Sequence, residues 1–195
     1  LVLLVLALAG CSSGRDEVVV YAALDREFSE PILNDVGLAS GLSVVVKYDI
    51  ESTKTVGLTQ AIMAESNRPR CDVFWNNEVV QTVLLAEAGL LQPYNSPSVD
   101  EWPDWARDSA SYWTGFAARG RVLIVNTALR PLASQWPTGT QDFLLPANAG
   151  RCGMARPLTG TTAAHAGWWL TELGREPALD LLSRYLANDV RFGPG

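Results

Sequence analysis

A strand and the polar loop after it are encoded by Asp72-Val73-Phe74-Trp75-Asn76-Asn77-Glu78. The short apolar run at 73–75 is typical of a strand buried in a parallel sheet. A helix is predicted next, from Val79 to Ala88, and it ends at Gly89 because glycine readily adopts the left-handed backbone that closes a helix. This stretch therefore predicts a strand–loop–helix unit with two amides and a carboxylate in its loop.

Two similar units precede this one in the sequence. Their strands and helices are predicted, in order, at 18–21, 29–41, 43–48 and 53–65. Strand and helix thus alternate three times, which is the pattern of a parallel sheet with right-handed crossover connections. In such sheets the ligand binds beyond the carboxyl ends of the strands. A site is therefore expected at the three exit loops.

The start of the first helix is predicted at Ser29-Glu30-Pro31. Serine is a favourable N-cap residue, and proline suits the first helical turn, where its missing N–H leaves no bond unmade. Residues 25–28 are accordingly expected to form a polar loop.

The second half of the chain predicts another α/β unit. An irregular connector is expected over Gln92–Tyr112, and an extended segment follows over Trp113–Thr127, with the apolar residues 122–125 at its centre. The later elements are a short helix near 141–145, a strand at 152–155, helices at 161–173 and 177–187, and a strand start at Val190. This order predicts an N-terminal lobe with its connector at 18–112, and a crossover with the first part of a second lobe at 113–195.

The N-terminus has the features of an exported lipoprotein. Leu1–Gly10 contains only Leu, Val, Ala and Gly, which is too short to span a bilayer and fits the apolar region of a partial signal peptide. Residues 8–11 resemble the bacterial lipobox, which implies lipidation of Cys11 and a lipidated tether at 11–17 on the periplasmic or extracellular face of a membrane. The alternative is a buried strand that ends in a structural cysteine. The absent initiator Met and the end beside a predicted strand indicate truncation at both ends.

Composition argues against several classes of function. The net charge is -6 and the basic residues are scattered, which does not suit a nucleic-acid partner. His165 is the only histidine, so a histidine-rich metal site is excluded, while a ligand contact and a structural role both stay open for it. The sequence has no nucleophile elbow, P-loop or paired-cysteine zinc spacing, so no enzyme and no catalytic cofactor are expected. Cys71 and Cys152 precede strands of different lobes and are expected to be unpaired.

An anion site is predicted at Thr159-Gly160-Thr161-Thr162, between a predicted strand and a helix. Glycine lets the backbone approach a ligand closely, the amides of the first helical turn point outward, and the hydroxyls add donors. The alternative is that Thr161 or Thr162 only caps its own helix.

The exit loops supply further candidates for ligand binding. Asn76 and Asn77 offer donors and acceptors, and Glu78 offers a carboxylate to a cation. Asp25 in the first exit loop and Lys54 at a helix start are charged candidates. The alternatives are a favourable charge at a helix N-terminus for Glu78, and ordinary solvated side chains for Asp25 and Lys54.

Four segments together resemble the ferric-iron-binding branch of the solute-binding proteins of ABC importers. They are Val20–Asp25, Arg68–Glu78, Trp113–Phe116 with Arg119, Val122 and Asn126, and Pro157–His165. The resemblance covers residues 18–195 and implies an α/β, two-lobed periplasmic-binding-protein fold of type II, with the second lobe incomplete in this chain. It also implies delivery of a bound solute to a membrane permease and its ATPase.

The same resemblance implies a metal site beside an anion site. Asp25 takes the first-loop position of an iron ligand, where the family usually has histidine or tyrosine. Glu78 matches the family's glutamate if one extra residue is allowed, and otherwise Asn77 takes that place. Residues 159–162 match the turn that holds a synergistic anion, carbonate or phosphate, while the family's tyrosine pair falls beyond Gly195.

The expected function is therefore a lipid-anchored binding protein for ferric iron with a synergistic anion. Iron prefers hard oxygen ligands, which Asp25 and Glu78 would supply. The alternatives are a binding protein for a phosphonate, a sugar phosphate or another small organic anion, and a ligand-sensing domain that signals to a receptor.

Overall fold

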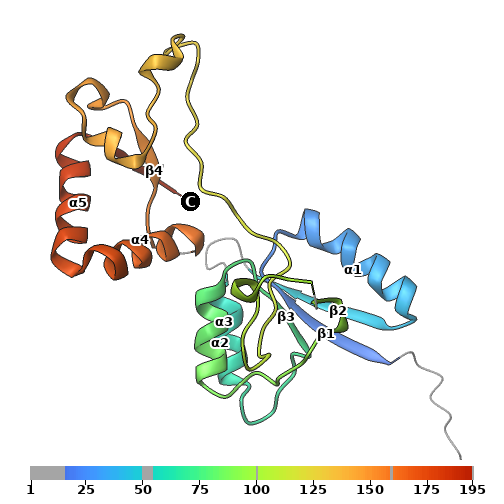
Figure 1. Ribbon diagram of the computed structural model, residues 1–195. Coiled ribbons are helices and arrows are strands. Elements are labelled where there is room, and N and C mark those ends of the chain that lie inside the picture. Colours follow the sequence, from blue (N-terminus) through green and yellow to red (C-terminus); the bar gives the residue numbers. More distant parts are fainter. Residues whose placement is uncertain (1–15, 50–54, 100, 159, 195) are drawn as a thin grey trace, which may run out of the picture.

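The computed structural model describes residues 16–49, 55–99, 101–158 and 160–194 (Figure 1). The helices and strands gather around two small parallel sheets, and a long extended segment runs from the first group to the second (Figure 1). The predicted signal peptide, Cys11 and Lys54 lie outside the described residues.

The first sheet has the strand order β2-β1-β3, and β1 pairs in parallel with both neighbours. Its strands are β1 (Glu17–Ala22), β2 (Ser43–Tyr48) and β3 (Val73–Trp75). The helix α1 (Arg26–Ser40) covers one face, while α2 (Val56–Ala64) and α3 (Val79–Glu87) lie on the other (Figure 1). Alternate residues of β1 serve the two faces, because Val20 and Ala22 pack with Leu33 of α1 whereas Tyr21 packs with Leu58 of α2.

The helix α1 begins at Arg26, so the prediction of a loop at 25–28 and a cap at Ser29 is wrong. The Asp25 carbonyl accepts hydrogen bonds from the amides of Phe28 and Ser29, which starts the helix one turn earlier. Ser29 is fully buried, and its hydroxyl donates to the carbonyls of Leu24 and Asp25 instead of capping a helix. Pro31 consequently lies inside the helix.

The second sheet consists of β4 (Gly153–Ala155) and β5 (Arg191–Gly193), which pair in parallel. The helices between them are α4 (Gly160–Leu173) and α5 (Arg175–Ala187). Their core is centred on Tyr185, which is fully buried and packs beside Phe143 and Trp169. The helix α5 starts two residues before the predicted Pro177, since proline is accepted in a first turn.

The segment at 117–126 is extended but belongs to none of the described strands. Leu123 packs against the second core, while the side chains of Val122 and Ile124 are 76% and 91% exposed. The predicted extended conformation is therefore present. Leu123 and Val125, which share one face of this apolar run, are partly buried, as the two-residue period of an extended chain requires.

Both cysteines among the described residues are unpaired, as predicted. Burial raises the pKa of the Cys71 thiol to about 11. None of the described helices is long and apolar enough to cross a lipid bilayer.

Tyr21 carries a polar group into the apolar layer between the first sheet and α2. Its hydroxyl donates to Oε2 of Glu65 at 2.7 Å, and Nζ of Lys47 lies 4.4 Å from the centre of its ring. Lys47 also forms an ion pair with Glu65 at 3.6 Å. Burial, followed by the hydrogen bond to Glu65, raises the pKa of Tyr21 to about 12.

Tyr21 should make the fold sensitive to alkaline pH. A raised pKa means that the folded state holds the phenol proton more tightly than the unfolded state. The contribution of this proton to the free energy of unfolding is therefore complete below pH 10 and is lost as the pH rises towards 12. The free energy of unfolding should fall by about 1.4 kcal/mol per pH unit more steeply than in Tyr21→Phe between these values. Urea denaturation at several pH values measures this, and equal slopes in the two proteins would refute it.

Candidate functional site

The carboxyl ends of β1 and β3 place most of the predicted site residues at one edge of the first sheet. The exit loop of β1 is Ala23–Asp25, and the loop after β3 is Asn76–Glu78. The amide of Ala23 donates to the carbonyl of Trp75 at 2.9 Å, so the two loops begin side by side. Thr55 at the start of α2 joins the same edge through Asn77.

Glu78 caps α3 with its side chain. Its two carboxylate oxygens accept hydrogen bonds from the amides of Val80 at 2.9 Å and Gln81 at 3.0 Å. The local role that the sequence left open for Glu78 is therefore present. A cation bound there would share oxygens that already hold helix amides.

The two asparagines of this loop are also engaged within the protein. Nδ2 of Asn76 donates to the hydroxyl of Thr82 at 2.9 Å, and its oxygen accepts from the amide of Asn77. Asn77 bonds to Thr55 and to the carbonyl of Ala23. Both side-chain amides therefore hold the loop in shape through hydrogen bonds within the protein.

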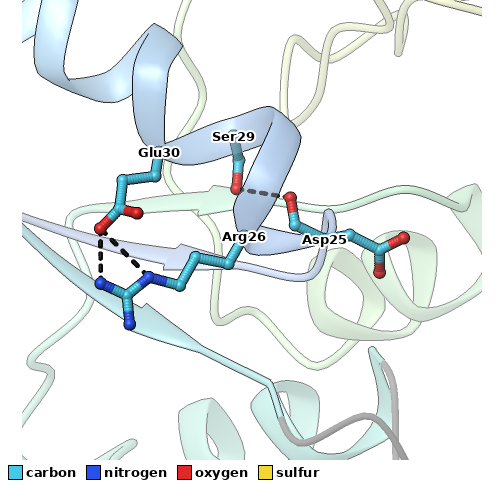
Figure 2. Close-up of polar contacts among 4 residues, drawn as sticks. All are labelled: Asp25, Arg26, Ser29 and Glu30. Atoms are coloured by element: carbon cyan, nitrogen blue, oxygen red, sulfur yellow. Dashed lines mark hydrogen bonds and ion pairs between the residues drawn. The ribbon is translucent and has the colours of Figure 1, made fainter.

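Asp25 offers its carboxylate outward. It caps α1 through its backbone carbonyl and makes no capping hydrogen bond with its side chain. Figure 2 shows this carboxylate pointing away from Ser29 and Arg26, whose guanidinium instead pairs with Glu30 at 2.6 Å. Among the described residues no group of three or more His, Cys, Asp or Glu side chains is arranged to hold a metal ion.

A second set of predicted residues lies at the N-terminus of α4, beside a cavity of about 450 Å³ that is open to solvent. The cavity is lined by Arg119, Gly120, Arg121, Val122 and Thr161. The Arg121 guanidinium donates to the hydroxyl of Thr162, which is 8% exposed. Thr159 lies outside the described residues, and Gly160 opens the helix with a φ of 57°, a value that favours glycine.

This cavity has the electrostatics of an anion site. Two guanidinium groups carry full positive charges, and the first amides of a 14-residue helix add a partial positive charge. Guanidinium groups bind carboxylate and phosphate through paired, charge-assisted hydrogen bonds. The sequence predicts Gly160, Thr161 and Thr162 as binding residues, but it does not predict Arg119 or Arg121. Their spacing of two in an extended segment was a usable signal, because such residues share a face.

His165 lies one turn further along α4. Its ring centre is 4.3 Å from that of Trp169 and 6.1 Å from that of Trp168. Burial, and then the charge of Arg121, lowers its pKa and favours the neutral imidazole. Its buried Nδ1 has no hydrogen-bond partner among the described residues. The ring contacts agree with the structural role that the sequence left open.

An aromatic contact connects the carboxyl edge of the first sheet with the segment that carries Arg119 and Arg121. Phe116, at the start of the extended segment, meets Trp75 edge to face with ring centres 5.7 Å apart. Trp75 ends β3, directly before Asn76. The segment that carries Arg119 and Arg121 therefore departs from the carboxyl edge of the first sheet.

Comparison with known proteins relates this arrangement to one fold. No protein-family model matches the chain. An uncharacterized protein of Haemophilus influenzae is 27% identical over an alignment of 202 positions, which covers 96% of this chain and 55% of that protein. The chain thus spans about half the length of the curated relative that it matches.

Two solved structures superimpose on almost the whole chain. Iron-bound HitA from Pseudomonas aeruginosa has a TM-score of 0.77 at 23% identity, and apo ferric ion-binding protein A from Pasteurella haemolytica has a TM-score of 0.76 at 21% identity. Each match covers 92% of this chain and 55% of the other. The chain has a periplasmic-binding-protein fold. This confirms the predicted α/β, two-lobed periplasmic-binding-protein fold of type II. The match covers only 55% of each compared chain, which agrees with a second lobe that is only partly represented.

The capping role of Glu78 predicts how its substitutions change stability. Glu78→Ala removes the acceptor of two helix amides and should lower the free energy of unfolding by about 1 kcal/mol. Glu78→Asp retains a carboxylate at a favourable N-cap position and should stay close to wild type. Urea denaturation compares the three proteins. A Glu78→Ala variant as stable as wild type would show that α3 does not depend on this carboxylate.

Proposed function

We propose that the chain is part of the solute-binding component of a bacterial ABC importer, which captures ferric iron together with carbonate or phosphate as a synergistic anion. The observation that carries this proposal is the cavity formed by Arg119, Arg121 and Thr161 at the start of α4, in a fold that binds solutes between two lobes. The cavity would hold the anion, with Gly160 and Thr162 beside it. A membrane permease and its ATPase would receive the solute.

The iron part of the proposal rests on Asp25 and on the fold. The Asp25 carboxylate points outward at the carboxyl edge of the first sheet, and ferric iron prefers hard oxygen donors. Glu78 would contribute only by sharing the oxygens that cap α3. One of the compared proteins is described as iron-bound and the other as a ferric ion-binding protein, at identities that establish the fold alone.

An export route and a membrane anchor complete the proposal. Lipidation of Cys11, with a signal peptide before it, would hold the protein at the periplasmic or extracellular face of the membrane. A binding protein that serves a permease benefits from this confinement, because anchoring raises its local concentration at the transporter.

A small organic anion without metal, such as a phosphonate or a sugar phosphate, is the second candidate solute. One observation favours it: two arginines line the cavity. Closure of the fold around the anion would then need no iron.

Titration of the full-length protein with ferric ion in the presence of phosphate separates these candidates. If the solute is iron, the tyrosine pair that the family resemblance places beyond Gly195 should give a visible charge-transfer band as iron binds. This band should weaken in Asp25→Ala and in buffer free of carbonate and phosphate. A protein that stays colourless while a phosphate ester raises its melting temperature would contradict the iron version and support the second candidate.

Arg121 should be essential for anion binding in either case. Arg121→Gln removes one charged donor from the cavity and should weaken phosphate binding about tenfold to hundredfold, as expected for a hydrogen bond to a charged group. Arg184→Gln, which breaks an exposed ion pair with Asp180 on α5, is the matched control and should bind as wild type does. Isothermal titration calorimetry measures both. Equal affinities in the two variants would exclude this cavity as the anion site.

A further inference from the structure

Three segments of the backbone meet at the side chain of Asn77. Its Nδ2 donates to the carbonyl of Ala23, in the exit loop of β1, at 3.1 Å. Its Oδ1 accepts from the hydroxyl of Thr55, at the start of α2, at 3.0 Å. Asn77 itself follows β3. One amide therefore joins parts of the chain that lie 54 and 22 residues away from it.

Thr55 uses its hydroxyl in an unusual way for its position. It is the N-cap residue of α2, where a threonine hydroxyl normally accepts a hydrogen bond from an amide of its own helix. Here the side chain makes no capping hydrogen bond and instead donates across the sheet edge to Asn77. The local role of a capping threonine is thus replaced by a contact between segments.

The backbone of Thr55 is held in a strained conformation. Its φ is 34°, in the left-handed region that a β-branched residue rarely adopts, and the residue is 2% exposed. Thr59, which is fully buried, donates both its amide and its hydroxyl to the Thr55 carbonyl, at 3.0 Å and 2.8 Å. Such strain persists only where surrounding contacts fix the residue, and it is concentrated at ligand-binding sites.

We propose that Thr55 and Asn77 are positioning residues, which hold the exit loop of β1, the start of α2 and the loop after β3 as one preformed surface for the solute. The inference rests on the proposed function and gives Asn77 a different role from the ligand contact that its sequence position suggested. Its donor and acceptor ends both bond within the protein, while Asp25 lies two residues after Ala23 and Glu78 directly follows Asn77. A surface ordered before binding spares the solute the entropy of ordering these loops.

The test uses the full-length protein and two variants that break the contact at either end. Thr55→Val keeps the shape but loses the hydroxyl, and Asn77→Ala loses both hydrogen bonds. Thr55→Ser retains the hydroxyl and should behave as wild type. Thr171→Val is the matched control, since it removes a threonine hydroxyl that donates to the Gly167 carbonyl within α4. Circular dichroism and the melting temperature establish that each variant is folded.

Hydrogen exchange measures the positioning itself and needs no solute. In Thr55→Val and Asn77→Ala, amides at 23–28 and 76–81 should exchange at least tenfold faster than in wild type, with the second sheet unchanged. Unaltered exchange in these loops overturns the proposal.

Affinity shows whether the ordered loops serve binding. With ferric ion and inorganic phosphate as the probe, Thr55→Val and Asn77→Ala should each bind about tenfold more weakly than Thr171→Val. The double variant should bind no more weakly than Asn77→Ala alone, because both changes remove the same hydrogen bond. If the amides of these loops exchange faster but the affinity of the variants is unchanged, the positioning role is overturned while the proposed function stands. A wild-type protein that binds neither iron nor phosphate refutes the proposed function instead.

Discussion

The parallel pairing of β1 with both of its neighbours is the constraint on which the first half of the molecule depends. Parallel strands direct all their carboxyl ends to one edge, so loops far apart in the sequence meet there. The bond between the Ala23 amide and the Trp75 carbonyl, and the contacts of Asn77, exist because of this geometry. An antiparallel neighbour would have sent one of these loops to the opposite edge.

Much of the fold follows from short-range patterns in the sequence. The sequence predicts β2 with the bounds that the structure has, because its run of valines is both apolar and β-branched. The start of α1 is missed since Ser29 has the chemistry of a cap, and only the packed structure shows that its hydroxyl turns inward to two carbonyls. The same pattern of residues is thus compatible with two helix starts, and burial decides between them.

The candidate site is less accessible to sequence reasoning, for a physical reason. Residue type indicates what Glu78, Asn77 and Thr161 can bond to, but not which partner is near enough. Glu78 finds amides two and three residues away, which a local pattern can suggest. Thr55 finds Asn77 only through the sheet, and Arg121 meets Thr162 across 41 residues. These contacts depend on tertiary structure, and no local period encodes them.

Cys71, beside Tyr21 in the apolar layer under the first sheet, has a consequence for redox chemistry. Thiol exchange and oxidation proceed through the thiolate, and with a pKa of about 11 only about one molecule in 10⁴ carries that form at pH 7. The sulfur is therefore a poor nucleophile. Half-buried and protonated, this thiol resists oxidation without pairing to a second cysteine.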